Sequence, residues 1–394
     1  MRRLLAALAL AAALLAVAPA QAIPAFARKY GAPCGLCHDQ LFPVLNDFGR
    51  HFKENGYQFD DNEVGYREAS TVRPDPDERL LLLDQVPLAV RAQSRLVVAT
   101  DPRGAGTNPV DLRPLDALYL LAGASVYPNV SFVASATLAP AAALHHGAVG
   151  FHNLFGPGYL NLRVGRLLVY DFLRPEHRFL TGYGDPIATT RVGLNPTVLD
   201  STQHGLDAYG RVLWRRLFYR VGVVQGAQGP DGVRDLDAYK DVFGELQLSL
   251  GSHLMLGGLH YRGRTQLTDD TRGVKVRFTD PFRATAATAA LTLGLLDLFG
   301  QAVYVFHANP FGAGEHADYW GFRVEARAWL GPRFSLMGRY DELTSHHLAS
   351  QAFRHATVYL AYLLLGNLHI AAESDVPLDR IETSTLSLRL DLAL

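Results

Sequence analysis

The sequence feature that most limits the possible folds of this chain is a series of short segments in which apolar and polar residues alternate, continuing to the last residue. One of them, "YWGFRVEARAWL", has apolar residues at Trp320, Phe322, Val324, Ala326, Ala328 and Leu330, opposed by Gly321, Arg323, Glu325 and Arg327. Successive residues of a β-strand point to opposite faces of the sheet. Each such segment therefore predicts a strand with one apolar side and one charged side.

Two more segments carry the same pattern. "VPLAVRAQSRLVV" sets Val86, Leu88, Val90, Ala92, Leu96 and Val98 against Arg91, Gln93 and Arg95, and "TLSLRLDLAL" sets Leu386, Leu388, Leu390, Leu392 and Leu394 against Ser387, Arg389 and Asp391. A soluble β-sandwich alternates in this way too. Arg and Glu in the middle of the polar faces, and strands that recur to the end of the chain, favour an outer-membrane barrel with lipid outside and a polar lumen inside.

The spacing of these segments predicts the size of the barrel. A segment of about ten residues and its Gly, Pro, Asp or Asn turn take about twenty residues, so residues 86–394 would form about sixteen antiparallel strands. The predicted fold class is therefore mainly β. Aromatic residues near segment ends are expected to form interfacial girdles, namely Tyr119, Tyr127, Phe218, Tyr219, Tyr261, Tyr304, Tyr340 and Tyr359. Many such barrels finish on an aromatic residue, whereas this chain finishes on Leu394.

Two longer stretches lack the alternation. "APAAALHHGAVGFHNLFGPG" and "YDFLRPEHRFLTGYGDPIATT" are interpreted as loops, or as loops that include a plug segment. The first contains His145, His146 and His152. Such histidines either contact a metal or a haem, or are solvated loop residues, and both interpretations stay open.

The first residues predict export. Arg2 and Arg3 precede an apolar run and a small-residue cleavage pattern, so residues 1–22 are interpreted as a signal peptide. No later stretch approaches the roughly twenty apolar residues of a membrane helix. Residues 61–85 are polar and contain prolines, which is typical of a linker. The expected location is the outer membrane, in contact with its lipid, and the net charge of −1 does not indicate nucleic acid as a partner.

Both cysteines of the chain lie in one cluster, "CGLCH". This spacing is the signature of c-type haem attachment, in which Cys34 and Cys37 would each form a thioether and His38 would be the proximal iron ligand. A zinc site would need two more ligands nearby, and the next histidine is the lone His51. A redox dithiol would follow a strand in a βαβ unit, and no such unit surrounds the motif. The cluster predicts one covalent haem c in a small helical domain over residues 23–60.

Apolar residues at helical spacing follow the motif and predict a helix that ends at Gly56. This stripe, expected to form the face toward the haem, consists of Leu41, Leu45, Phe48 and Phe52. His51 is a candidate for the distal iron ligand, beside an open position or one supplied by the barrel. Of the two methionines outside the signal peptide, the alternation places Met337 in the lumen, as a further candidate, and Met255 toward lipid.

The segment "IPAFARKYGAPCGLCHDQLFPVLNDFGRHFKENGYQF" resembles the N-terminal domain of the fused monohaem cytochrome–porins of iron-oxidising bacteria. In that family a Pro-Ala-Phe-Ala-Arg run precedes CxxCH, and Phe-Pro-x-Leu-Asn-x-Phe-Gly and a basic helix ending in Gly-Tyr follow it. These elements stand here at Pro24 to Arg28, Cys34 to His38, Phe42 to Gly49, and Gly56-Tyr57. The match covers about a tenth of the chain, and the barrel matches in architecture only.

The resemblance implies an outer-membrane cytochrome whose haem closes or lines the pore. Electrons from extracellular Fe(II) would pass through the haem to a periplasmic cytochrome or another electron carrier. Arginines on the polar strand faces would then pair either with haem propionates or with lumen carboxylates such as Glu325 and Asp391. These arginines are Arg91, Arg95, Arg323, Arg327 and Arg389.

Three functions are compatible with these patterns. The first is an outer-membrane c-type cytochrome, an Fe(II) oxidase in the broad sense, which predicts a haem-stained and heat-modifiable membrane protein. The second is a porin-like channel in which the haem is a plug or a sensor, and it predicts solute conductance that does not depend on the haem. The third is a soluble periplasmic cytochrome with a β-rich domain, recovered without detergent. Alternation through the whole chain favours the first.

Overall fold

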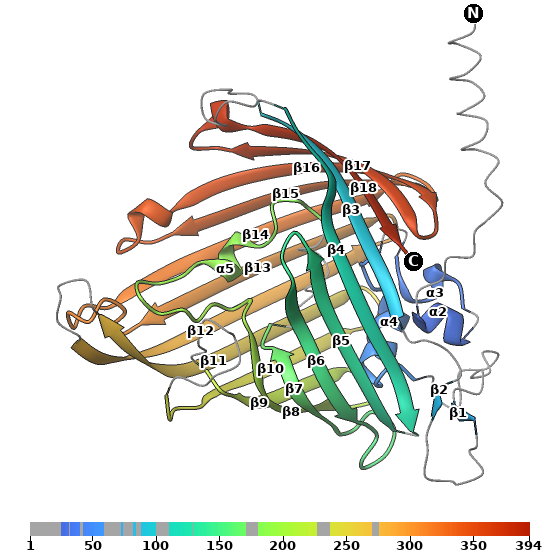
Figure 1. The fold of residues 1–394 in the computed structure, drawn as a ribbon, viewed down its shortest axis with the longest axis horizontal. Coiled ribbons are helices and arrows are strands. Elements are labelled where there is room, and N and C mark those ends of the chain that lie inside the picture. The colour runs from blue at the N-terminus through green and yellow to red at the C-terminus, as the bar shows by residue number, and fades with distance from the viewer. Residues whose placement is uncertain are drawn as a thin grey trace, which may run out of the picture.

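The computed structural model describes residues 25–30, 32–39, 42–58, 72–73, 82–83, 88–99, 110–127, 129–170, 180–226, 237–269 and 276–394. Sixteen antiparallel strands form a closed barrel, in which the last strand, β18, pairs with the first, β3. Figure 1 shows the strands tilted around a common lumen. The predicted barrel and its strand number are confirmed, and the soluble sandwich is excluded, because closure leaves no sheet edge.

The barrel strands are β3 (Leu88–Ala99), β4 (Val110–Tyr127), β5 (Val130–Ala139), β6 (Ala143–Phe151), β7 (Asn161–Leu168), β8 (Thr202–Val212), β9 (Leu217–Val224), β10 (Asp241–Leu250), β11 (Leu254–Asp269), β12 (Val276–Leu293), β13 (Leu296–His307), β14 (Ala317–Trp329), β15 (Phe334–Thr344), β16 (Phe353–Leu365), β17 (Leu368–Pro377) and β18 (Thr385–Ala393). A separate pair, β1 (Val72–Arg73) and β2 (Leu82–Leu83), lies within the predicted linker. The predicted signal peptide lies outside the described residues.

The alternating segments form strands with the predicted faces. On β14, Val324 is 59% exposed and the neighbouring Arg323 only 3%. On β18, Leu386, Leu388 and Leu390 are exposed, while Ser387, Arg389 and Asp391 are buried. In a closed barrel the backbone groups of each strand pair with its neighbours, so none is left unpaired in hydrocarbon. The apolar outer belt is the surface that faces the lipid. The chain is therefore an outer-membrane barrel.

The two ends of the barrel differ in the length of their connections. At one end most are short, as at residues 213–216, 251–253, 294–295, 330–333 and 366–367, whereas those at the other end include 308–316, 345–352 and 378–384. Outer-membrane barrels have short periplasmic turns and longer extracellular loops. The short-turn end is accordingly called the periplasmic mouth below.

Within the described residues, three short helices precede the barrel: α2 (Ala25–Tyr30), α3 (Cys34–Cys37) and α4 (Asp47–Glu54). They lie at the periplasmic mouth, the end at which the C-terminus is marked in Figure 1. In the described ranges, no helix is both long and apolar enough to cross a membrane. We call residues 25–58 the N-terminal domain.

The helix predicted after the motif is shorter than its apolar stripe. Leu45 precedes α4, which starts at Asp47 because the Asn46 side chain caps it by accepting from the Gly49 amide at 2.9 Å. Its end at Gly56 is confirmed: the amides of Gly56 and Tyr57 donate to the carbonyls of Lys53 and Phe52, with Gly56 at a φ of 71°.

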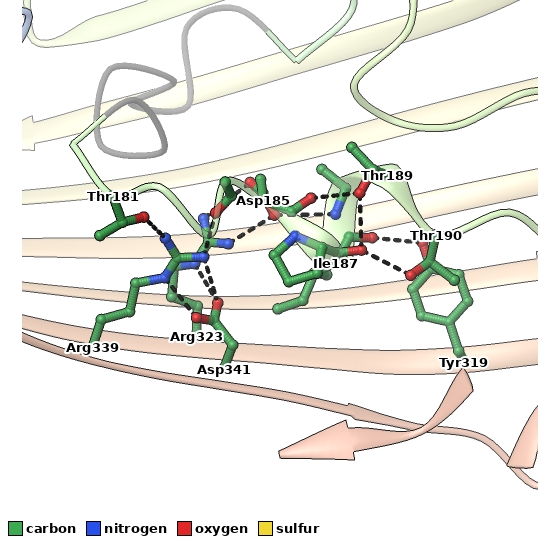
Figure 2. A network of polar contacts seen from close by, with 12 residues as sticks. Thr181, Asp185, Ile187, Thr189, Thr190, Tyr319, Arg323, Arg339 and Asp341 are labelled. Carbon is green, nitrogen blue, oxygen red and sulfur yellow. Dashed lines mark hydrogen bonds and ion pairs between the residues drawn. The ribbon is translucent and has the colours of Figure 1, made fainter. Parts of the chain in front are cut away.

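Residues 180–201, which connect β7 to β8, fold into the barrel, and we call them the inward segment. Figure 2 shows the polar contacts that attach it to the barrel wall. Arg323 donates to both Asp185 oxygens at 2.7 and 2.9 Å. Arg339 donates to the Thr181 hydroxyl and to the Gly184 carbonyl. The short helix α5 (Pro186–Thr189) lies in this segment. Its Ile187 and Ala188 join an apolar cluster with Leu259 and Tyr261 of the wall. The second predicted loop thus contains a plug segment, as expected.

The filled lumen overturns several sequence-based expectations. Met255 faces inward, 8% exposed, and packs against Ala290 and Phe299, so its predicted contact with lipid is wrong. Three residues expected in the girdles are instead buried in the lumen, namely Phe218, Tyr261 and Tyr359. The stretch expected to be a loop around His145 and His146 is largely strand β6. Tyr261 packs with Ile187 of the inward segment, and Tyr359 packs with Leu180 and with Val44 of the N-terminal domain. Met255 and Phe218 pack against other inward-facing residues of the wall.

Replacing Asp185 with Ala is expected to loosen the inward segment by about 2–4 kcal/mol, because Arg323 loses a charged partner and α5 loses its capping carboxylate. Faster hydrogen exchange of amides in residues 182–190 would check this. Thr190→Ala is the matched control, since the Thr190 hydroxyl donates to Pro186 within the same segment. Equal exchange in both variants would contradict the assignment.

Candidate cofactor site

The CGLCH motif forms one tight turn of helix. Helix α3 spans both cysteines, which are not joined in a disulfide, and the His38 amide donates to the Cys34 carbonyl at 3.0 Å. The His38 Nδ1 lies 3.3 Å from the Val44 carbonyl oxygen. A carbonyl can only accept, so Nδ1 carries the proton and Nε2 is left as the atom with ligand character.

Helix α4 lies very close to the motif. A Cβ added at Gly49 would stand 1.9 Å from the Cys37 carbonyl oxygen, so only glycine fits there. The Asn46 side chain donates to the Leu36 carbonyl at 3.0 Å, and its backbone amide donates to Cys37. These contacts fix the orientation of the two cysteines relative to α4.

Gly49→Ala is expected to destabilise the N-terminal domain by about 1–3 kcal/mol or more, because the clash is with backbone. Hydrogen exchange of the backbone amides in residues 34–58 is expected to become faster. Gly35→Ala is the matched control, since nothing lies within 4 Å of a Cβ at that position. Unchanged exchange in Gly49→Ala would contradict the close packing.

The apolar stripe of α4 packs inside the N-terminal domain. Phe52 makes edge contacts with the rings of Phe26 and Tyr30 at 5.5 and 5.6 Å between centroids. Phe48 and Cys37 pack against the same cluster. Leu41 lies outside the described residues. The cavity described below meets the other face of α4, and the face toward the haem stays a prediction.

The N-terminal domain is held in the periplasmic mouth by polar contacts with the wall. Arg211 of β8 donates to both Glu54 oxygens at 2.5 and 2.7 Å, and both side chains are almost fully buried. Lys29 donates to Ser125 of β4 at 2.5 Å. On the opposite side Phe42 meets His369 of β17, with 4.8 Å between ring centroids. The domain thus bridges the mouth from β4 and β8 to β17.

A cavity of about 780 Å³ lies between the N-terminal domain and the turns of the periplasmic mouth. From the domain it is lined by Cys34, Gly35, His38, Asp39, Phe42, Asn46, Asp47, Arg50 and His51. From the barrel its lining includes Arg211, Trp214, Arg215, Arg216, His253, Met255, Thr292 and Trp329. The volume lies within the roughly 300–1,000 Å³ of small-molecule and cofactor sites.

The electrostatics of the cavity suit a ligand that carries carboxylates. Four arginines reach its lining: Arg50, Arg211, Arg215 and Arg216. Burial raises the pKa of the Cys34 thiol, which disfavours the reactive thiolate of a redox dithiol. Burial also lowers the pKa of His51; the carboxylate of Glu54 acts against this shift and the neighbouring arginines act with it.

Of the residues singled out in the sequence, Cys34, His38 and His51 line this cavity, while Cys37 lies one helical turn on, beside Phe48. Met337 faces the lumen as predicted, but Val44, Leu180 and Trp329 cover it, and it does not line the cavity. His152 is buried and hydrogen-bonded to Ser131, so it is not a solvated loop residue.

Four of the five arginines expected in the lumen pair with carboxylates, and none of the five lines the cavity. Arg91 binds Asp391 at 2.5 Å, Arg95 binds Asp116 at 2.9 Å, Arg323 binds Asp185 at 2.7 Å and Arg327 binds Glu325 at 3.0 Å. Arg389 donates to the Leu180 carbonyl and to Tyr359. Three of the arginines that do line the cavity lie at or beside the turn after β8, where no alternation marks them, and the fourth lies on α4; they are Arg211, Arg215, Arg216 and Arg50.

In the part of the chain that the structure describes, His, Cys, Asp and Glu side chains form no group of three that could hold a metal ion by themselves. A zinc site at the motif would need such a group. A porphyrin tethered by two thiols would bring its own four nitrogen ligands, so His38 and one further residue would be enough to hold its iron. The residues present fit a haem c.

No family model and no curated protein sequence matches this chain. Solved structures match the barrel. The fold is similar to a loop L8 deletion mutant of OmpT, an outer membrane protein of Vibrio cholerae, at 10% identity over 79% of this chain and 99% of that one, with a TM-score of 0.55. An anion-selective porin from Comamonas acidovorans matches at 12% identity over 79% and 99%, also with a TM-score of 0.55.

A third solved structure, Salmonella typhi OmpF in complex with daunomycin, matches at 10% identity over 78% of this chain and 97% of that one, with a TM-score of 0.54. At these identities the likeness establishes the fold alone. The uncovered fifth of this chain leaves room for the N-terminal domain as an addition to a porin-type barrel.

Proposed function

We propose that this chain is an outer-membrane c-type cytochrome that passes electrons between the two sides of the membrane through one covalent haem. The observation that carries the proposal is the joint cavity: Cys34 and His38 of a CxxCH turn open onto a cofactor-sized space that the barrel completes. Cys34 and Cys37 would hold the haem and His38 would bind its iron. When bound, the haem supplies a one-electron redox centre.

The surrounding residues supply the binding functions that such a centre needs. Hydrogen bonding to Val44 orients the His38 ring. Arg215 and Arg216 at the cavity would bind propionate carboxylates. Arg50 and Arg211 pair with Asp47 and Glu54. The turns of the barrel line the space on the other side, and they would set the exposure of a bound haem to water, which tunes its redox potential.

Packed side chains lead from the cavity into the lumen. Phe42 lines the cavity and touches His369, whose Nε2 lies 3.4 Å from the Tyr359 hydroxyl. All three residues are buried. A bilayer does not conduct electrons, so a route of packed protein atoms toward the extracellular loops is what transfer across the membrane requires. Extracellular Fe(II) as the donor, and a periplasmic cytochrome or similar carrier as the acceptor, follow from the resemblance of residues 23–59.

The test is Fe(II) oxidation across a membrane. Purified protein in liposomes that contain a trapped, impermeant one-electron acceptor is exposed to Fe(II) outside. We expect reduction of the haem and then of the acceptor, and no acceptor reduction with a Cys34→Ser, Cys37→Ser variant. A haem that stays ferric under every ferrous condition would remove Fe(II) as donor, and a mature protein without haem would remove the proposal.

A diffusion channel is the second candidate, favoured by the porin-type barrel. The N-terminal domain in the mouth and the inward segment on the wall act against it, because both occupy lumen space. Solute-permeable conductance in planar bilayers that is the same with and without haem would support the channel.

A further inference from the structure

We infer that His253, in the barrel turn between β10 and β11, is the distal ligand of the haem iron. The inference rests on the proposed function, since it names the second axial ligand of the same site. The lining of the cavity offers three side chains that bind iron well: His51, His253 and Met255.

His253 has the ring hydrogen bond that is typical of an iron-binding histidine. Its Nδ1 lies 3.1 Å from the Thr292 carbonyl oxygen, which can only accept, so Nδ1 carries the proton and Nε2 keeps its lone pair. A hydrogen bond from the other ring nitrogen to a carbonyl is typical of metal-binding histidines. His38 has the same arrangement with Val44 on the opposite wall of the cavity.

The backbone around His253 is held in place as well. The Thr292 amide donates to the His253 carbonyl at 2.8 Å, so main chain and side chain both bind the same residue of β12. Thr292 itself lines the cavity. A turn that is fixed twice positions a ligand at little entropic cost.

The other two candidates are placed less well. The Met255 side chain is only 8% exposed and packs with Ala290 and Phe299. His51 lies at the edge of the cavity beside Arg211 and Arg215, and it also borders a second, much smaller space near Glu54. Within the described residues no hydrogen bond fixes its ring, whereas the rings of His38 and His253 are each held by a carbonyl.

A ligand from the barrel has a mechanical consequence. His38 belongs to the N-terminal domain and His253 to the wall, so the two axial bonds would join the domain to the barrel. Docking of the domain and the coordination state of the iron are then coupled, which a ligand within the domain, such as His51, would not produce.

The test is the spin state of the haem in the full-length protein, read from its absorption and electron paramagnetic resonance spectra and from carbon monoxide binding. Wild type is expected to be six-coordinate and low-spin. His253→Ala is expected to become high-spin and to bind carbon monoxide readily. His253→Met is expected to remain six-coordinate with a raised potential, since a thioether ligand favours the ferrous state; this variant keeps the inference testable if the alanine variant is unstable.

The outward-facing His260→Ala is the matched control and should keep the wild-type spectra. His51→Ala and Met255→Leu test the two competing ligands. Loss of the low-spin signal in His51→Ala or Met255→Leu, with His253→Ala unchanged, would overturn the inference and leave the haem site intact. A high-spin wild-type haem would overturn it too. A wild-type protein without haem would instead refute the proposed function, so the two failures are distinguishable.

Discussion

Replacing both Cys34 and Cys37 with Ser is expected to abolish covalent haem attachment completely while the barrel still assembles. The reason is that these are the only two cysteines of the chain and the only residues that could form thioethers. The haem-staining band of the denatured protein should disappear, and the mobility shift on heating, which reports the folded barrel, should remain. Haem-dependent reduction of the trapped acceptor should fall to background.

Ser252→Ala is a suitable control, because Ser252 lines the same cavity and supplies no covalent or iron bond to the haem. It should retain haem and activity. Covalent haem in the double variant, or acceptor reduction at the wild-type rate without haem, would contradict the assignment of the motif.

Glu54→Ala is expected to weaken docking of the N-terminal domain in the periplasmic mouth by about 3–5 kcal/mol, because it leaves Arg211 buried without its charged partner. Protease cleavage within residues 25–58 of the folded, membrane-inserted protein should become faster. Ion conductance in planar bilayers should rise as the mouth opens.

The double variant Glu54→Ala, Arg211→Ala provides the matched comparison. Removing both charges eliminates the unpaired arginine, so docking should recover part of the loss, and the cycle isolates the pair energy. If the Glu54→Ala and Arg211→Ala effects simply add, the pair does not hold the domain. Asp47→Ala, at an exposed position of the same helix, should change neither readout.

The barrel could be predicted from sequence because lipid imposes a strict rule on outward-facing residues. Outward-facing positions such as Val324 and Leu388 had to be apolar. The charged residues that alternate with them on the same strands, such as Arg323 and Arg389, had to face inward. The rule fails for inward positions once the lumen is filled by protein. Met255 and Tyr261 lie on the inner face although they are apolar, since Phe299 and the inward segment cover them.

The site could be predicted only in part for a related reason. Cys34, Cys37 and His38 form a motif whose chemistry depends on spacing along the chain. The opposite wall of the cavity comes from barrel turns that contain residues such as Arg215 and His253. These turns are distant from the motif in sequence and approach it only when the barrel has formed. Turn residues carry no periodicity, so nothing in the sequence marks them.

The cavity has one wall from the N-terminal domain and one from the barrel turns, and both cysteines keep partial exposure beside it. Under the proposed function, a haem on Cys34 and Cys37 would touch two parts of the chain that fold separately. Such a group would act as a filler between them, so its loss would leave two surfaces that meet across an empty space.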